Sequence, residues 1–342
     1  MRYYLIILLL SVFVISCKTT VGPSGAIEPK KELNIAFGSC NKHDLDNLLW
    51  DDILDLEPDL WIWGGDNIYA DTDNMQLLRE MYEAQNKVPV YNRLRKKVKM
   101  LGTWDDHDYG LNDGGVEFEA KAESQQVFLD FLNVSRDDPR RTREGVYHSF
   151  DYKGRGGSVR ILVLDTRYFR SPLIKDTITQ KRYTPDLSGR GTILGEQQWK
   201  WLEEQLQTSK ADFNLIVSSI QFLSGEHGFE CWANFPNEVS RMEQLISGSG
   251  AKGVIFLSGD RHISEFSRKD VPGLSYPLVD FTSSGLTHAY RGFTGEPNAY
   301  RVGEVVSTES FGWLRLNLET GEVHMQMRGD GGQILQDLKQ QY

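Results

Sequence analysis

Four apolar, strand-like runs of this sequence each end in a short stretch of metal-ligand residue types. Residues 33–37 lead into GSCN at 38–41, and residues 60–64 lead into GDNIY at 65–69. Residues 98–103 precede WDDHD at 104–108, and residues 253–257 precede SGDRH at 258–262. In open α/β sheets, ligands gather beyond the carboxyl ends of the strands. Carboxylates, imidazoles and a thiol at several strand ends therefore predict a polynuclear metal site.

Strand-like and helix-like segments alternate along the chain, which favours an α/β sheet with helices on its faces. Apolar periodicity predicts helices at residues 45–56, 74–97 with a break at Pro89, 116–132, 195–210 and 236–247. Further strands are predicted at residues 146–152, 159–165, 213–222, 278–282, 312–318 and 322–326. Residues 167–191 are predicted to form a long loop. We predict one domain over residues 33–342, because no linker follows residue 32.

The N-terminus has the features of a targeting segment. Arg2 precedes an apolar run at residues 5–15, which is shorter than the roughly 20 residues that span a bilayer. The run ends in VISC at 14–17, which resembles a bacterial lipobox; an ordinary signal peptide is the alternative. We therefore expect a signal peptide at 1–17, a lipid anchor on Cys17 and a flexible tether at 18–32. The expected location is the bacterial cell envelope, on the periplasmic or outer surface, with the lipid attaching the protein to the membrane.

Charge and cysteine content narrow the classes of partner. The chain carries a formal net charge of −10 and offers no basic stripe, which argues against binding a nucleic-acid backbone. We expect a monomer. Besides Cys17, the sequence holds Cys40 and Cys231, which either form a disulfide or leave Cys40 free to bind metal as a thiolate.

The four strand-end stretches, taken in order, resemble the PhoD-type alkaline phosphatases of the calcineurin-like metallophosphoesterase superfamily. GDNIY is similar to the Gly-Asp-x-x-Tyr block that purple acid phosphatases and PhoD-type enzymes share, and WDDHD resembles the PhoD variant of the Gly-Asn-His-Asp/Glu block. SGDRH resembles the Gly-His-x-His block with Asp in place of the first His. FGSC at 37–40 matches the PhoD habit of a cysteine where most relatives have Asp, and LDTR at 164–167 is also similar. The resemblance implies a β-sandwich core flanked by helices in αββα layers.

The resemblance also implies a set of metal ligands. Cys40, Tyr69 and His262 would hold one ion, Fe(III), for which a phenolate beside a carboxylate and a thiolate is a suitable set. Asp66 would bridge this ion to a second one.

Asp106 and Asp260 would hold the second ion, with Asp105 left open as the ligand in place of Asp106. Many relatives place a metal-binding His where this chain has Gln221, so the second site is rich in oxygen. An oxygen-rich site favours Ca(II) over Zn(II), with Mn, Mg and Zn left open as alternatives. His227 could be recruited instead, although we expect it to line the pocket.

The remaining roles concern the substrate. His107 would contact the phosphate or the leaving group, and Asp108 would orient its imidazole. Further substrate-contact candidates are Asn67, Arg261, His227, Trp232 and Arg167.

We therefore expect a phosphoric-ester hydrolase that attacks small phosphate monoesters outside the cytoplasm with a metal-bound hydroxide. A phosphodiesterase or phospholipase D-like activity on diesters is the first alternative. A non-catalytic lipoprotein that binds phosphate compounds or metal is the second.

Overall fold

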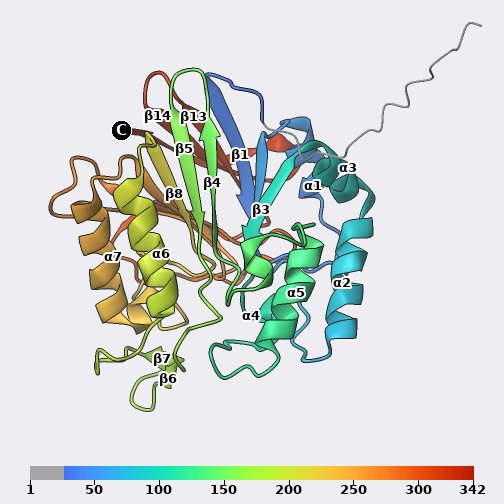
Figure 1. Ribbon diagram of the computed structural model, residues 1–342, viewed down its shortest axis with the longest axis vertical. Helices are drawn as coiled ribbons and strands as arrows, with labels where there is room; N and C mark the ends of the chain where they lie inside the picture. The colour runs from blue at the N-terminus through green and yellow to red at the C-terminus, as the bar shows by residue number, and fades with distance from the viewer. Residues whose placement is uncertain (1–26) are drawn as a thin grey trace, which may run out of the picture.

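Two mixed β-sheets face each other and carry helices on their outer sides in this computed structural model, which describes residues 27–342 (Figure 1). The predicted signal peptide, Cys17 and most of the predicted tether lie outside the described residues. Within residues 27–342, none of the helices is both long and apolar enough to cross a membrane.

The first sheet has six strands. In spatial order they are β15 (Ile334–Gln341), β14 (Glu322–Arg328), β13 (Phe311–Asn317), β1 (Glu32–Gly38), β2 (Leu60–Gly64) and β3 (Lys99–Thr103). Strands β1, β2 and β3 are parallel, so their carboxyl ends lie at the same edge.

The second sheet has seven strands. In spatial order they are β12 (Arg301–Val306), β10 (Ser264–Lys269), β11 (Leu278–Ser283), β9 (Val254–Ser258), β8 (Phe213–Val217), β5 (Ser158–Val163) and β4 (His148–Lys153). The central strands β11, β9, β8 and β5 run parallel to one another.

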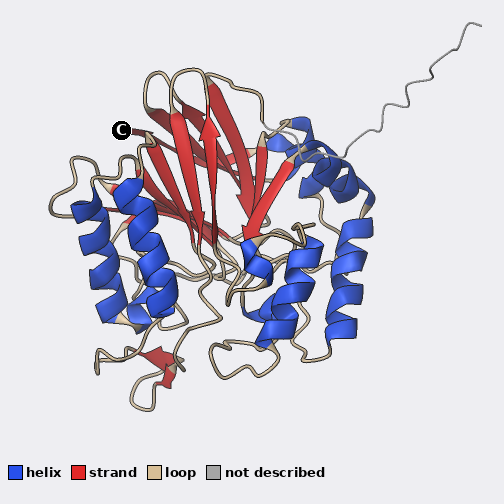
Figure 2. Cartoon of the chain, in the orientation of Figure 1, coloured by secondary structure: helices blue, strands red, loops and turns tan. Residues whose placement is uncertain are grey.

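Helices cover the outer face of each sheet, which gives the predicted αββα layers (Figure 2). On the first sheet lie α1 (Leu49–Asp55), α2 (Met75–Lys87), α3 (Pro89–Lys97) and α5 (Lys121–Phe131), and the short α4 (Asp106–Tyr109) follows β3. On the second lie α6 (Gly195–Thr208) and α7 (Pro236–Ser249). Asn74 caps α2 by accepting bonds from two backbone N–H groups, and Pro89 starts α3, as the predicted break requires.

Alternation along the strands decides which side chains enter which layer. On β2, Leu60 and Ile62 join the core between the sheets, whereas Trp61 and Trp63 pack under the helices. Both faces are fully buried, which explains why the run reads as continuously apolar. Burial of each large apolar side chain contributes about 1.5–3 kcal/mol and fixes the register of the strands that carry the site.

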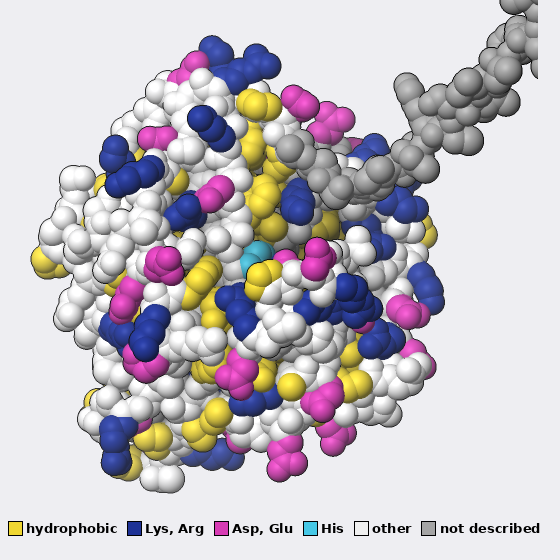
Figure 3. All heavy atoms as spheres, viewed as in Figure 1, with side chains coloured by type: hydrophobic (Ala, Val, Ile, Leu, Met, Phe, Trp, Pro, Cys, Tyr) yellow, Lys and Arg dark blue, Asp and Glu magenta, His cyan; other side chains and the backbone are white. Residues whose placement is uncertain are grey.

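Several elements differ from the sequence-based expectation. Strands β10, β12 and β15 were not predicted, and the loop at 167–191 contains a two-stranded hairpin, β6 (Ile174–Lys175) and β7 (Tyr183–Thr184). The end of the predicted tether is already held to the domain: the Lys30 backbone N–H donates to the Tyr152 hydroxyl at 2.8 Å. On the face shown in Figure 3, positive and negative side chains are interspersed.

Candidate metal centre

The strand ends that carry the predicted ligands meet at one edge of the two sheets. The Asn41 backbone N–H after β1 donates to the Asp66 carbonyl after β2 at 2.8 Å. A Cβ at Gly65 would lie 2.6 Å from that of Asp105, and one at Gly259 would lie 2.5 Å from the Ser39 hydroxyl oxygen. Only glycine permits these approaches, which explains the Gly-Asp pairs in two of the motifs.

Four of the predicted ligands adopt a left-handed backbone conformation. The φ angles are 59° at Cys40, 50° at Asp66, 71° at Asp260 and 55° at His262. Such angles are uncommon for residues with a Cβ, and they cluster at functional sites because the surrounding structure must hold them in place. The backbone here turns sharply after each strand and directs the side chains into a shared space.

In the described part of the chain, three sets of side chains are close enough to hold a metal ion, and Asp66 belongs to all three. The sets are Cys40, Asp66 and His262; Asp66, Asp106 and His107; and Asp66, Asp105, Asp106 and Asp260, each with ligand atoms within 4.8 Å of one another. The shared position of Asp66 matches the bridging role that the resemblance implies.

Tyr69, a further predicted ligand, lies beside the set of Cys40, Asp66 and His262. The Cys40 Sγ lies 3.4 Å and the Tyr69 hydroxyl 3.3 Å from the same Asp66 oxygen. The Tyr69 hydroxyl also lies 3.0 Å from His262 Nε2. Cys40 and Cys231 are both free thiols, so the alternative of a disulfide between them is wrong.

The carboxylate side leaves the choice between Asp105 and Asp106 open, because both belong to one set with Asp260. One Asp106 oxygen accepts bonds from the Asn112 amide at 2.8 Å and the Asp113 backbone N–H at 2.7 Å. The Asp105 Oδ2, by contrast, is buried with no hydrogen-bond partner among the described residues. A buried carboxylate oxygen without a donor is costly, and a cation would relieve that cost.

Electrostatics give a second indication that this cluster needs a cation. Burial, together with Asp106, raises the pKa of Asp66 well above its usual value. Burial also raises the pKa of Asp260 to about 7 and that of the Cys40 thiol to about 12. Burial and the neighbouring His288 lower the pKa of His262 to about 3, which keeps the imidazole neutral as a metal ligand requires. The donors therefore fit metal ions of high charge.

Asp108 does not have the predicted role of orienting His107. Its buried carboxylate accepts the backbone N–H groups of Asp66 and Asp105, at 3.2 and 2.7 Å, and the Tyr82 hydroxyl at 2.9 Å. Asp108 therefore holds the strand ends together.

Asp71, which the sequence analysis did not single out, is the carboxylate that contacts His107. Its two oxygens both lie 2.8 Å from His107 Nδ1. Asp71 also has a left-handed backbone, with φ of 43°, as four of the predicted ligands do.

Two of the predicted substrate contacts are instead buried structural groups. The Arg167 guanidinium is fully buried and pairs with Asp105 and Glu230. Trp232 is fully buried in the core under α6 and α7, and its indole N–H donates to the Ser218 hydroxyl. Each partner satisfies a group that would be costly to bury alone.

The other predicted polar contacts also differ in part from expectation. The Asn67 amide is buried and donates to Asp108 and to the Thr103 carbonyl. The Gln221 amide donates to Glu265 and Thr282. His227 is buried against Phe229 and is not among the residues that line the cleft beside Asp106, Asp260 and His262. Arg261 does line that cleft, paired with Glu296 at 2.6 Å.

A cleft of about 480 Å³ opens onto three of the predicted ligands, Asp106, Asp260 and His262. Besides Asp106, His107, Asp260, Arg261 and His262, its lining residues include Asn112, Asp113, Arg182, Phe229, Glu230, His288 and Tyr290. No role was predicted for His288, whose ring lies edge-on to Tyr69 and to His262 at centroid distances of 4.8 and 4.4 Å. It lies on the loop after β11, which showed no ligand motif.

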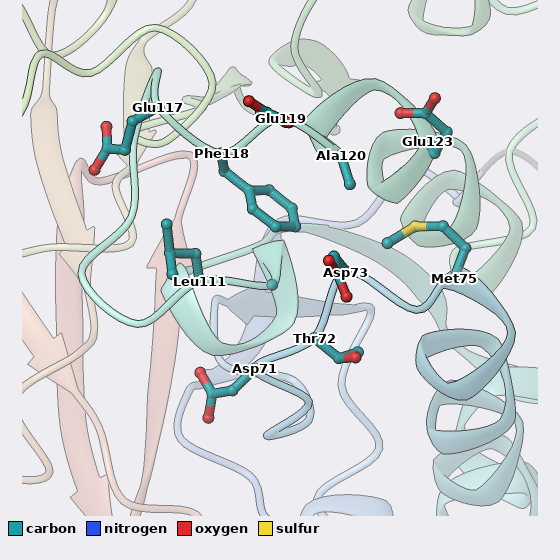
Figure 4. Close-up of a pocket in the computed structure, with 11 residues that line it drawn as sticks. Asp71, Thr72, Asp73, Met75, Leu111, Glu117, Phe118, Glu119, Ala120 and Glu123 are labelled. Carbon is teal, nitrogen blue, oxygen red and sulfur yellow. The ribbon is translucent and has the colours of Figure 1, made fainter.

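A second pocket, of about 750 Å³, lies beside α4 and is lined by acidic side chains (Figure 4). These are Asp71, Asp73, Glu117, Glu119 and Glu123. Asp71 is therefore shared between this pocket and the His107 contact, and its carboxylate is in reach of solvent.

Comparisons with known proteins agree with this geometry. The model of the PhoD-like phosphatase family matches residues 74–328. The chain is 25% identical to alkaline phosphatase D of Bacillus subtilis (strain 168) over 181 residues, which cover 47% of this chain and 30% of that protein. The aligned region is thus under a third of the length of that relative.

Solved structures share the fold. A structure of PhoD superposes with a TM-score of 0.72 at 18% identity, covering 92% of this chain and 69% of the other. A dimetal phosphatase from Danio rerio superposes with a TM-score of 0.55 at 14% identity, covering 91% of this chain and 99% of the other.

Proposed function

This chain belongs to the PhoD-like phosphatase family, and from this premise we propose that it is a metal-dependent phosphoric-ester hydrolase. The single observation that carries the proposal is the position of Asp66, which belongs to all the candidate ligand sets found within residues 27–342. Two ions that share one carboxylate would lie close enough to contact one phosphate group together.

We assign the ligands to two ions. Cys40, Tyr69 and His262 would hold Fe(III) with Asp66, because thiolate, phenolate and neutral imidazole are suited to that ion. Asp260 with Asp105, Asp106 or both would hold a divalent ion, and an all-oxygen set favours Ca(II). When bound, the ions supply Lewis acidity and lower the pKa of water in the site.

The side chains around the ions position the ester and move its protons. His107 lines the cleft, and Asp71 occupies its Nδ1, so Nε2 is the nitrogen left for the substrate. We assign to Nε2 a proton that is donated to the leaving-group oxygen as the ester bond breaks. Asp71 accepts the Nδ1 proton and stabilises the imidazolium that carries the second proton on Nε2, and it fixes the orientation of the ring.

Elemental analysis with a visible absorption spectrum tests the metal assignment. Fe(III) bound to the Cys40 thiolate and the Tyr69 phenolate should give a charge-transfer band that weakens in Tyr69→Phe and in Cys40→Ser. An active, iron-free and colourless enzyme would overturn both roles.

Diester hydrolysis is the second candidate, and one observation favours it. Both guanidinium groups in the cleft are already paired, Arg182 with Asp113 and Arg261 with Glu296. They are therefore poorly placed to neutralise the second charge of a monoester dianion. Turnover of an aryl monophosphate compared with that of a bis-aryl phosphate separates the two candidates, and hydrolysis of neither ester would favour the non-catalytic alternative.

We also propose that the protein acts outside the cytoplasm, attached to a membrane through lipid on Cys17. The support is the lipobox-like sequence before that cysteine. Mass spectrometry of the N-terminal peptide should find a diacylated Cys17, and an unmodified cysteine on the mature chain would refute the anchor.

A further inference from the structure

The cleft next to the metal centre holds the two most exposed aromatic side chains in the described part of the chain. Tyr290 is 47% exposed and Phe229 is 38% exposed, whereas the other large hydrophobic side chains exposed to this degree within residues 27–342 are aliphatic. Both aromatic residues line the cleft beside Asp106, Asp260 and His262. Two exposed aromatic side chains that line the same cleft indicate a binding function.

Phe229 is held by contacts that leave part of its surface open. The Arg261 guanidinium lies over the Phe229 ring, with its central carbon 4.0 Å from the ring centroid. Arg261 is itself fixed by an ion pair with Glu296 at 2.6 Å. A cation packed on one face of an aromatic ring stabilises the ring's orientation, so the exposed part of Phe229 faces solvent without further rearrangement.

Tyr290 is hydrogen-bonded to the backbone of His262, a predicted metal ligand. Its backbone N–H donates to the His262 carbonyl at 2.6 Å. Its ring packs edge-on against Phe293, at a centroid distance of 6.3 Å. These two contacts therefore hold Tyr290 next to His262 and the metal centre.

We propose that Phe229 and Tyr290 form a subsite for a planar aromatic group on the leaving-group side of the phosphate ester. This inference rests on the proposed hydrolase function and adds a substrate class to it: phosphate esters of aryl, arylmethyl or heteroaromatic alcohols. The polar half of the cleft, where the carboxylates of Asp106 and Asp260 and the His262 imidazole would hold metal ions, takes the phosphate end. The aromatic half holds the organic end, where the paired Arg182 and Arg261 add no free charge.

The size of the preference follows from aromatic contacts. An aromatic pair strengthens an interaction by about two- to twelvefold beyond the effect of the area that it buries. A benzyl group and a cyclohexylmethyl group bury similar areas and leave as alcohols of similar acidity, so this extra contribution is what distinguishes their phosphate esters. With both Phe229 and Tyr290 in contact with the group, we expect the benzyl ester to have a kcat/KM about tenfold higher than the cyclohexylmethyl ester.

The experiment measures the kcat/KM ratio of benzyl phosphate to cyclohexylmethyl phosphate with the full, metal-loaded protein. Phe229→Leu and Tyr290→Leu should each lower the ratio about threefold, and the double variant should bring it to about one. Phe229→Tyr and Tyr290→Phe keep an aromatic ring and should keep the preference. Leu77→Ala serves as a control outside the cleft and should leave the ratio unchanged. Leu77 lies on α2, and its side chain is 42% exposed.

A second measurement does not depend on turnover. Benzylphosphonate and cyclohexylmethylphosphonate are not hydrolysed, and their binding can be measured by calorimetry. Tighter binding of the benzyl compound, lost in the double Leu variant, supports the subsite. Equal binding of the two phosphonates, or a kcat/KM ratio near one in the wild type, overturns it while leaving the hydrolase function standing. If the wild type hydrolyses neither ester, the proposed function fails, and the phosphonate comparison still decides the subsite.

Discussion

Replacing Asp71 should slow hydrolysis without removing metal, because Asp71 contacts His107 and belongs to none of the candidate ligand sets. A hydrogen bond to a charged group contributes about 1.5–3 kcal/mol. The Asp71 side chain is 45% exposed, which screens its charge and favours the lower end of that range. Since about 1.4 kcal/mol is a factor of ten, Asp71→Ala should lower kcat/KM about ten- to thirtyfold. Asp71→Asn keeps a neutral acceptor and should lose less.

The assay is steady-state hydrolysis of an aryl monophosphate, with metal content measured on each preparation. Asp73→Asn is the matched control, because Asp73 lines the same acidic pocket and makes no contact with His107. A double-mutant cycle sharpens the test: once His107 is replaced by Ala, Asp71→Ala should cause no further loss. Additive losses, or an Asp71→Ala enzyme that has lost its metal, would refute the assignment of Asp71 to His107.

Three further predictions concern stability and metal. Asp108→Asn should lower the free energy of unfolding by about 1–3 kcal/mol, measured by urea titration. The amide keeps one acceptor oxygen, and the buried donors that were bonded to the other oxygen lose their acceptor. Unchanged stability would contradict this role. Burial and Arg261 lower the pKa of His227 from 6.5 to about 3. As pH falls below about 6.5, His227 therefore becomes protonated in the unfolded chain but stays neutral in the native chain. Stability should therefore fall with acidification, and His227→Phe should make the fall shallower by about 1.4 kcal/mol per pH unit between pH 4 and 6. In chelator-treated protein, the Asp260 pKa of about 7 lies above its unfolded value, so stability should fall as pH rises from about 4 to 7. Metal should accordingly raise Tm more at pH 8 than at pH 5, and an equal rise at both would contradict the carboxylate cluster.

The strand-end stretches were predictable because they combine two strong local signals. Fully apolar runs such as β2 and β9 read as central strands, and glycine beside a ligand type marks the sharp turn after them. Strand β12 could not be found in the same way, since its residues are partly exposed and include Gly303. Its position depends on pairing with β10 across the sheet.

The partners of the site residues were harder to predict than the ligands. Asp108 stands next to His107 in the chain, yet the α4 turn directs its carboxylate back to the strand ends. Asp71 is 36 residues from His107 in sequence, and only the folded turn after β2 brings the two together. His288 has no motif at all. Spacing predicts which groups a strand end presents, whereas contacts between loops depend on tertiary structure.

Reconstitution of the metal-free protein tests whether hydrolysis depends on metal ions bound at Asp66. The protein is stripped with a chelator, and hydrolysis of an aryl phosphate is followed as Fe(III) and Ca(II) are added back in known amounts. We predict that the stripped protein is inactive and that activity returns with bound metal in the wild type but not in Asp66→Asn. Full hydrolysis by the stripped protein, or full recovery in Asp66→Asn, would contradict it.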